Sequence, residues 1–439
     1  MKLPISKPSR PKILVVSPAS RRYDATLHYY QAEFSAVVSH LRAQFPSHAI
    51  EAMPMGLTQA PQRVLVEKFL DGPQIILIWC RVWEAPAALR AAREARAICP
   101  GAAILVWGDA AHSMPQYFQR PPFDAYVASG DPEAVLADAI RGLNVGGVPV
   151  PGLAMVSQGW QQPCTGRLLD PAEWPFPALD VIDFADYRQA REFRGKPTDD
   201  LSFSVSKGCA VGCEWCTTPL KEGKRDRRRP VAQTVAYMQS TVGQFELFQM
   251  HSPMFMQNRL WCAEFVAAMR DQSLHIPFKI VTLQQHLEDS AMLCDLASVG
   301  LRAVGFGVET LTADKARGRL TAKVDESSLD RVKTNLARAG VQGKAYVQLG
   351  LPGQTREDVL YTREVLLRLG LKIRATGATP FQLLRGMTLK QLDDLELEAW
   401  DRKSFYREDC GLTPYEFHKL LNDPEGFEAV EAITSEEAA

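Results

Sequence analysis

Short apolar runs alternate with amphipathic stretches along the first third of the chain. Continuous apolar runs of about four to eight residues are typical of buried strands, and apolar spacings of three and four are typical of helices. Strands are predicted at residues 12–16, 75–78 and 103–107, and helices at 30–45, 86–98 and 132–143. Because alternating strands and helices favour a parallel sheet, we expect residues 1–148 to form a Rossmann-like domain. Its ligand crevice would lie beyond the carboxyl ends of the strands.

The pattern fails over residues 149–200, where Pro, Gly, Gln and Trp accumulate. An example is the sequence Trp174-Pro175-Phe176-Pro177. A connector with so many aromatic residues is expected to lie pinned across a surface rather than to move freely.

Strand and helix patterns alternate again from Leu201 onward. Strands are predicted at 201–205, 245–250, 278–282, 303–308, 344–349 and 373–379. Helices are predicted at 231–242, 260–272, 291–299, 326–339 and 355–369. Six such units predict a partial (β/α)6 barrel over residues 201–390, with its site at the carboxyl ends of the strands. A short helical tail at 391–439 completes an expected α/β fold.

Charge and hydropathy narrow the function classes. The 439 residues include 50 Lys and Arg against 51 Asp and Glu, a net charge of −1, which argues against nucleic-acid or membrane-surface binding through bulk charge. The longest apolar stretch, residues 75–80, is far shorter than the roughly 20 residues of a membrane-spanning helix. The first residues show no apolar export segment. We therefore expect a cytoplasmic protein that binds neither nucleic acid nor a membrane.

Three of the nine cysteines are clustered. Cys209, Cys213 and Cys216 lie in the loop after the first expected barrel strand, and three thiolates at this spacing can converge on zinc or on an iron–sulfur cluster. A structural zinc site requires a fourth Cys or His close in the sequence. The next cysteines, Cys164 and Cys262, are both more than 40 residues from the cluster. Three ligands on a four-iron cluster would leave one iron open for a substrate or cofactor.

The spacing CxxxCxΦC, with Trp215 as the aromatic residue, resembles the signature of the radical S-adenosylmethionine (SAM) superfamily. The resemblance implies a [4Fe-4S] cluster whose open iron chelates the amino and carboxylate groups of SAM. It also implies reductive cleavage of SAM to methionine and a 5′-deoxyadenosyl radical that abstracts hydrogen from a substrate.

Three further segments match the superfamily in order. The run Gly305-Phe306-Gly307-Val308-Glu309-Thr310 resembles the strand-end motif whose acid, here Glu309, binds the ribose hydroxyls. Residues 349–355 resemble the "GLPGET" turn that lines the adenine pocket, and residues 380–388 resemble the "P.P.PGT" segment. The cofactor-binding residues that the resemblance implies are Trp215, Gly307, Glu309, Gly350, Pro352, Phe381 and Gln382.

The front of the chain resembles the cobalamin-binding-type domain of class B radical SAM enzymes, through residues 108–112 and 123–133. Two departures affect that cofactor: Asp109 replaces a glycine of "GGPH", and Asp131-Pro132 interrupts "GEGE". Both departures place side-chain atoms where the backbone of a glycine would otherwise come close to a corrin. The motif DxHxxG is also missing, since residues 24–28 have the wrong spacing. These departures favour a domain that keeps the fold without cobalamin, with cobalamin binding as the open alternative.

The architecture resembles the radical diol-dehydratase of aminoglycoside biosynthesis, which implies radical dehydration of an aminosugar diol in antibiotic biosynthesis. The alternative is a cobalamin-dependent radical SAM methyltransferase of natural-product biosynthesis, and a zinc-binding module is a third hypothesis. The basic run 221–229 is interpreted as the "R.R.P" stretch that follows the signature in this superfamily.

Dehydration needs an acid and a base, and five residues are candidates. Tyr346 and Gln348 share one face of their expected strand, and His251 ends another strand. Asp109 and His112 would lie at the crevice of the front domain. The expected partners are a small-molecule substrate and an external one-electron donor, namely a flavodoxin, a ferredoxin or a dedicated reductase, with a homodimer as one candidate assembly.

Overall fold

The computed structural model describes residues 10–19, 30–144, 149–158, 164–193, 199–211, 213, 216–312, 324–351, 354–377 and 381–394. The chain divides into two compact units. Unit 1 comprises Met1–Ala210, Thr217–Pro253 and Leu383–Glu398, and unit 2 comprises Val211–Cys216, Met254–Gln382 and Ala399–Ala439. Within the described residues, no helix is long and apolar enough to cross a membrane.

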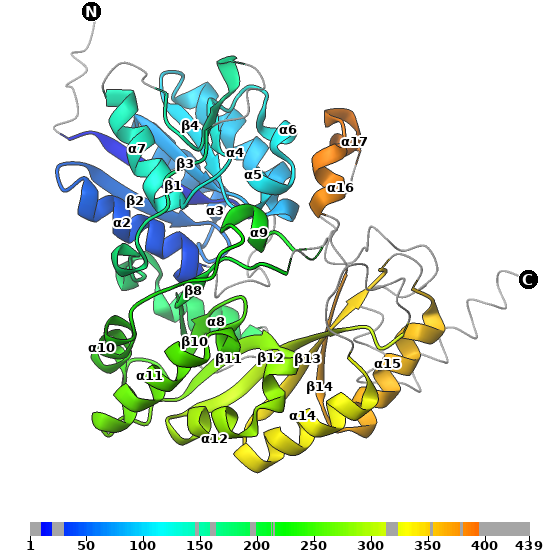
Figure 1. Cartoon of the computed structure of the whole chain (residues 1–439). Helices are drawn as coiled ribbons and strands as arrows, with labels where there is room; N and C mark the ends of the chain where they lie inside the picture. Colours follow the sequence, from blue (N-terminus) through cyan, green and yellow to red (C-terminus); the bar gives the residue numbers. More distant parts are fainter. Residues whose placement is uncertain are drawn as a thin grey trace, which may run out of the picture. The chain divides into compact units, whose positions relative to one another are not determined.

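The first sheet lies in unit 1 and has the strand order β2-β1-β3-β4-β5-β6 (Figure 1). Its strands are β1 (Lys12–Ser17), β2 (Ala49–Pro54), β3 (Ile75–Trp79), β4 (Ala103–Trp107), β5 (Ala125–Val127) and β6 (Leu153–Met155). The first five pair in parallel, as predicted for alternating strands and helices, whereas β6 pairs antiparallel with β5. The sequence analysis missed β2, β5 and β6, because none of them carries a continuous β-branched run.

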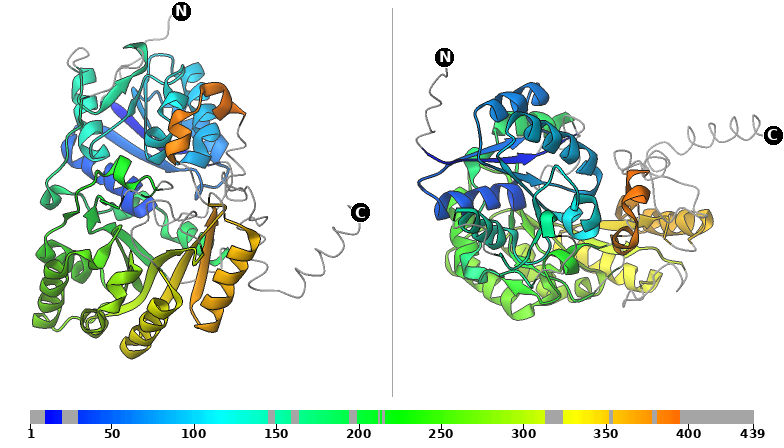
Figure 2. Two further views of the ribbon diagram at one scale, coloured as in Figure 1. Left: turned by 45° about the vertical axis from the view of Figure 1, so that its right-hand side comes forward. Right: turned by 90° about the horizontal axis from the view of Figure 1, so that it is seen from above.

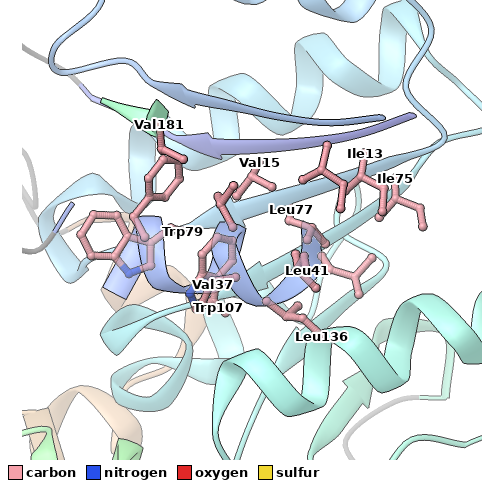
Figure 3. Close-up of a cluster of buried hydrophobic side chains, with 14 of the residues drawn as sticks. Ile13, Val15, Val37, Leu41, Ile75, Leu77, Trp79, Trp107, Leu136 and Val181 are labelled. Atoms are coloured by element: carbon pink, nitrogen blue, oxygen red, sulfur yellow. The ribbon is translucent and has the colours of Figure 1, made fainter. Parts of the chain in front are cut away.

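Helices pack around this sheet. They are α2 (Ala36–Gln44), α3 (Pro61–Leu70), α4 (Ala85–Ile98), α5 (Asp109–Ser113), α6 (Pro115–Phe118) and α7 (Pro132–Asn144). The single helix predicted at 30–45 is wrong in detail, because its first turn is a π-helical segment, η1 (Tyr30–Ser35). Figure 3 shows the core between strand and helix, where Val15, Leu77, Leu41 and Leu136 are fully buried.

The connector has more structure than expected. It contains β6, three 3-10 turns and helix α8 (Phe184–Phe193), and its Val181 packs into the core of the first sheet. Tyr187 of α8 donates a 2.8 Å hydrogen bond to the Asp200 carboxylate. Trp174 is buried, with 3% of its surface exposed. These contacts pin the connector within unit 1.

The second sheet has the strand order β14-β13-β12-β11-β10-β7. β7 (Asp200–Ser204) and β10 (Leu247–His251) pair in parallel in unit 1. β11 (Phe278–Leu283), β12 (Leu301–Glu309), β13 (Gln342–Leu349) and β14 (Lys372–Gly377) pair in parallel in unit 2. The expected fold class, a Rossmann-like domain with a partial (β/α)6 barrel, is confirmed.

The helices of this sheet begin and end within two residues of their predicted bounds. They are α10 (Val231–Thr241), α11 (Arg259–Asp271), α12 (Ser290–Ser298), α14 (Glu326–Ala339) and α15 (Arg356–Arg368). Local chemistry explains the agreement: the Asp325 side chain caps the start of α14, and Gly340 ends it in the left-handed region.

Helices cover one face of β12–β14, and half-buried side chains lie on the other face. Figure 2 shows α14 and α15 along the outer side of these strands. On β13, Ala345, Val347 and Leu349 are buried, while the alternate residues Lys344 and Tyr346 are half-buried. We call the face that carries Lys344 and Tyr346 the concave face. Two short helices, α16 (Phe381–Gly386) and α17 (Leu389–Asp393), follow β14 at the junction of the predicted barrel and the predicted tail.

Candidate active site

The cysteine loop follows β8 (Ser206–Lys207). Gly208 allows the chain to turn there, because its φ is 94° and a Cβ would meet the Arg225 carbonyl oxygen at 2.0 Å. Cys209 of unit 1 is buried, and its N–H donates to the Gly223 carbonyl at 3.0 Å. Cys213 and Cys216 of unit 2 are half-buried, and the Cys216 N–H donates to the Cys213 carbonyl at 3.1 Å. Trp215 lies outside the described residues.

The described residues alone assemble no group of three metal-ligating side chains. The joint ligand set of Cys209, Cys213 and Cys216 therefore stays a prediction. Their chemistry fits an iron–sulfur cluster, because three thiols lie on one short loop and two of them are only half-buried.

Glu309 is the last residue of β12, and its backbone is unusual. Its φ of 59° lies in the left-handed region, which a residue with a long side chain rarely adopts. Gly307 makes room for the side chain, since a Cβ at Gly307 would meet Glu309 Oε1 at 2.5 Å. Gln348 donates a hydrogen bond to the carboxylate, but Oε2 is shielded from solvent and has no hydrogen-bond partner. Burial raises the pKa of Glu309 to about 7 despite the Gln348 hydrogen bond.

An unsatisfied carboxylate oxygen at a strand end fits a ligand that donates hydrogen bonds. A ribose diol offers two adjacent hydroxyl donors, and a carboxylate can accept from both. The residues present therefore fit the ribose of SAM, as the family resemblance implies for Glu309.

Tyr346 and Gln348 lie on the concave face beside Glu309. The Tyr346 side chain extends over β12, where a Cβ at Gly305 would meet its hydroxyl at 2.2 Å. The two residues keep the same orientation that strand alternation predicts. Their expected catalytic role stays a prediction.

The side chain of Gln354 closes the turn after β13, a role that was not predicted from the sequence. The Gln354 Oε1 accepts hydrogen bonds from the Gly350 N–H at 2.8 Å and from the Leu351 N–H at 3.3 Å. Its Nε2 donates to the Gln348 carbonyl at 3.1 Å. Gly350 has a φ of 76°. Gln354 replaces the glutamate of the family's turn, and its amide can both donate and accept where a carboxylate only accepts.

Three other expected cofactor contacts either lie outside the described residues or have a different setting. Pro352 lies outside the described residues. Phe381 and Gln382 begin helix α16 rather than continuing a strand, and their side chains are not among those described. The helix follows because residues 381–386 contain good helix formers before Gly386.

The remaining candidates, Asp109, His112 and His251, lie around a buried ion pair in the crevice of unit 1. Lys221 of α9 (Thr218–Lys221) is hydrogen-bonded to Glu33 of η1. Burial would raise the pKa of Glu33, but the charge and hydrogen bond of Lys221 hold it below its usual range. Burial would likewise lower the pKa of Lys221, but Glu33 and neighbouring carboxylates raise it.

Burial shifts all three candidates toward neutrality. It raises the pKa of Asp109 to about 6, lowers the pKa of His112 to about 4, and lowers the pKa of His251 below its usual value. The charges of Glu33 and Lys221 act on each of the three. A cluster of this kind can hold or exchange a proton.

The crevice is narrow where the ion pair lies. Its cavity, lined by Glu33, His112, Lys207 and Lys221, has a volume of about 20 Å³, which is enough for about one water molecule. A second cavity of about 530 Å³ borders His112 and Arg385, a size typical of drug-like ligands. Residues 24–28, which carry the imperfect DxHxxG match, lie outside the described residues.

The basic residues 227–229 form ion pairs and hydrogen bonds within unit 1. The Arg227 guanidinium binds both Asp131 oxygens, at 2.7 and 2.9 Å. Arg229 is fully buried and donates to the Trp174 carbonyl at 2.7 Å. Asp131, one of the departures from "GEGE", is therefore the ion-pair partner of Arg227 in the "R.R.P" stretch. The sequence of either segment alone does not show this pairing.

The comparisons with known proteins begin at the level of sequence. No protein-family model matches the chain. An uncharacterised methyltransferase of Pyrococcus horikoshii is 21% identical over 357 residues, which cover 79% of this chain and 75% of the relative.

Two solved enzymes share the architecture. TsrM of Kitasatospora setae, a radical SAM methyltransferase with tryptophan and aza-SAM bound, has a TM-score of 0.66 at 15% identity over 84% of this chain and 74% of TsrM. This chain shares the overall α/β architecture of TsrM. OxsB, a cobalamin-dependent radical SAM enzyme with aqua-cobalamin bound, has a TM-score of 0.65 at 14% identity. That match covers 95% of this chain and 62% of OxsB. At these identities the likeness is one of fold.

Proposed function

We propose that this protein is a radical SAM enzyme that acts on a small-molecule substrate. The observation that carries the proposal is Glu309, a shielded carboxylate with an unsatisfied oxygen at the end of β12 in a radical SAM fold. The cysteine spacing supports it independently, because the triad is far from Glu309 in the sequence.

In this proposal Cys209, Cys213 and Cys216 hold a [4Fe-4S] cluster, which supplies the electron that cleaves SAM when an external donor reduces it. Glu309 accepts hydrogen bonds from the ribose, and Gln348 orients the acid by donating to it. Gln354 fixes the turn at Gly350 that would face the adenine.

The test is anaerobic reconstitution with iron and sulfide, followed by incubation with SAM and dithionite. We expect about four irons per chain and formation of 5′-deoxyadenosine. Cys213→Ala is expected to abolish this product. Cys164→Ala is the matched control, because Cys164 is an exposed thiol outside the triad. Zinc in place of iron, or full activity of Cys213→Ala, would refute the proposal.

The buried ion pair of Lys221 and Glu33 in the crevice of unit 1 supports radical chemistry without a corrin. We therefore propose hydrogen abstraction from a small polar metabolite as the reaction. Dehydration of an aminosugar diol is one outcome of such a step, and its acid and base would come from the cluster of Asp109, His112 and His251 or from Tyr346.

A second candidate is cobalamin-dependent methyl transfer, and the comparisons support it better than they support dehydration. The P. horikoshii relative is named a methyltransferase, TsrM is a radical SAM methyltransferase, and TsrM has also been solved with cobalamin bound. The two candidates differ in a visible spectrum. After anaerobic incubation with hydroxocobalamin and desalting, retained corrin absorption favours methyl transfer, whereas its loss favours a corrin-free reaction.

The electron donor follows from the same proposal. Nothing in the described residues forms a second cysteine cluster, so the proposal assigns reduction to a flavodoxin, a ferredoxin or a dedicated reductase. Replacement of dithionite by a flavodoxin and its reductase is expected to sustain 5′-deoxyadenosine formation.

A further inference from the structure

A cavity beside the carboxyl end of β5 has the size of a metabolite site. Its volume is about 530 Å³, which is within the range of small-molecule sites in proteins. Every residue that lines it belongs to unit 1. Among the described lining residues there is one arginine, Arg385, and no Asp or Glu. The cavity therefore offers positive charge without a carboxylate to balance it.

One wall of the cavity comes from the segment after β14, and this segment is held against α6 (Figure 1). The Gln116 amide of α6 donates a hydrogen bond to the Met387 carbonyl at 2.9 Å. Beside it, the Arg120 guanidinium binds both oxygens of Asp393, each at 2.8 Å. These contacts fix the wall that carries Arg385, so the cavity is a built feature of unit 1.

Two hydroxyl groups on the cavity wall have a proton to donate. The Tyr126 hydroxyl accepts a 2.9 Å hydrogen bond from the Gln119 amide, and the Ser129 hydroxyl accepts a 3.0 Å hydrogen bond from the Gly166 N–H. Neither hydroxyl donates to another described residue, and Tyr126 is only 3% exposed. Because a hydroxyl can donate one hydrogen bond while it accepts others, both groups can still donate to a ligand.

The charge of Arg385 acts on two buried residues of this wall. Burial lowers the pKa of His112 to about 4, and the charges of Lys221 and Arg385 lower it further. Burial raises the pKa of Tyr126, while the Gln119 hydrogen bond and the Arg385 charge oppose that rise. Among the described residues, none is an ion-pair partner of Arg385. A guanidinium and two hydroxyl donors therefore border one cavity, next to a neutral imidazole.

We infer that this cavity binds a small acidic metabolite, whose carboxylate or phosphate accepts hydrogen bonds from Arg385, Tyr126 and Ser129. Oxyanions form their strongest hydrogen bonds with charged donors such as a guanidinium. Pro115 and Met387 supply apolar wall for the rest of the ligand. The inference goes beyond the proposed function, because it adds a ligand site within unit 1 to the SAM site.

The test measures modification of individual arginines by phenylglyoxal in the reconstituted holoenzyme, followed by mass spectrometry. The probes are inorganic phosphate, glycerol phosphate, succinate and uncharged glycerol, each added separately and without SAM. The control is Arg338 of α14, an exposed arginine of unit 2 that has no ion-pair partner among the described residues.

We expect glycerol phosphate or succinate to slow modification of Arg385 but not of Arg338, and glycerol to slow neither. The stronger protectant distinguishes a phosphate ligand from a carboxylate ligand, and inorganic phosphate shows whether the anion alone suffices. Tyr126→Phe keeps the ring and removes one donor to a charged group, so protection of Arg385 should weaken by about tenfold or more. Ser129→Ala removes the other donor and should have an effect of the same size. Tyr361→Phe, which removes an exposed hydroxyl of unit 2, should leave protection unchanged.

The inference is overturned if no anion protects Arg385, if glycerol protects as well as glycerol phosphate does, or if protection is unchanged in both hydroxyl variants. It is also overturned if SAM or hydroxocobalamin, added alone, protects Arg385 as strongly as the anions do, because the cavity would then belong to a cofactor. Failure of the proposed function is a separate result. It would show as absence of 5′-deoxyadenosine from the holoenzyme with SAM and dithionite, with protection of Arg385 intact.

Discussion

The crevice of unit 1 and the concave face of unit 2 both bring charged side chains together in a parallel α/β unit, but they treat charge differently. In the crevice, Lys221 pairs with Glu33, and Lys207 pairs with Glu133 at 2.8 Å. On the concave face, Glu309 keeps an oxygen without a partner, and Lys344 is surrounded by like charges.

The difference separates structural charge from charge that awaits a ligand. Removing one partner of a buried ion pair destabilises the fold, because the remaining charge is buried without a counter-ion. A buried charge without a partner lowers stability and persists where a ligand supplies what is missing. Single-residue changes in the two regions separate these two kinds of charge.

Lys221→Ala is expected to lower the free energy of unfolding by about 3–5 kcal/mol, because it leaves the buried Glu33 carboxylate without its ion-pair partner. The measurement is the midpoint of urea denaturation, read by a probe in unit 1. Arg63→Ala is the control, since Arg63 and Glu67 form an exposed pair whose loss costs about 0.5 kcal/mol or less. Equal effects of the two changes would mean that burial does not distinguish these pairs.

Glu309→Ala is expected to have the opposite profile. The affinity for SAM falls by about 10- to 150-fold, the loss of hydrogen bonds to a charged group, while the urea midpoint stays the same or rises. Binding is measured by isothermal titration of the reconstituted enzyme. A large loss of stability with unchanged SAM affinity would assign Glu309 a structural role.

The pH dependence of SAM binding reports the ionisation of Glu309. Burial raises the pKa of Glu309 to about 7, and only the ionised form accepts from both ribose hydroxyls. SAM affinity should therefore weaken as the pH falls below about 7, by up to tenfold per pH unit. The profile should flatten in Glu309→Gln and stay unchanged in Glu364→Gln, an exposed residue of α15. An unchanged profile in Glu309→Gln would contradict the assignment.

Tyr346→Phe is the mildest change, because it removes one hydrogen bond to Arg374 and keeps the ring. We expect the free energy of unfolding to fall by about 1 kcal/mol, measured from the midpoint of urea denaturation. Tyr361→Phe, which removes an exposed 2.6 Å hydrogen bond to Glu326, is the control. The same urea midpoint in Tyr346→Phe and in the wild type would show that the hydrogen bond to Arg374 adds no stability.

The alternation of apolar runs determined the order of strands and helices, because buried strands and amphipathic helices leave different periods in a sequence. It predicted β7, β10 and the strands of unit 2 to within a few residues, and the motif around Gly307 and Glu309 located the carboxylate at its strand end. It also predicted the alternation that places Tyr346 and Gln348 on one face.

The tertiary structure alone decided how charge is distributed. Lys221 is far from Glu33 in the sequence, and Asp131 is far from Arg227, so only the fold brings each charge to its partner. The sequence alone does not relate Lys344 to Arg374. The register of β13 and β14 places both residues on the same face of the sheet. Local patterns fix which residues form an element, whereas pairing and burial depend on elements that meet only when the chain has folded.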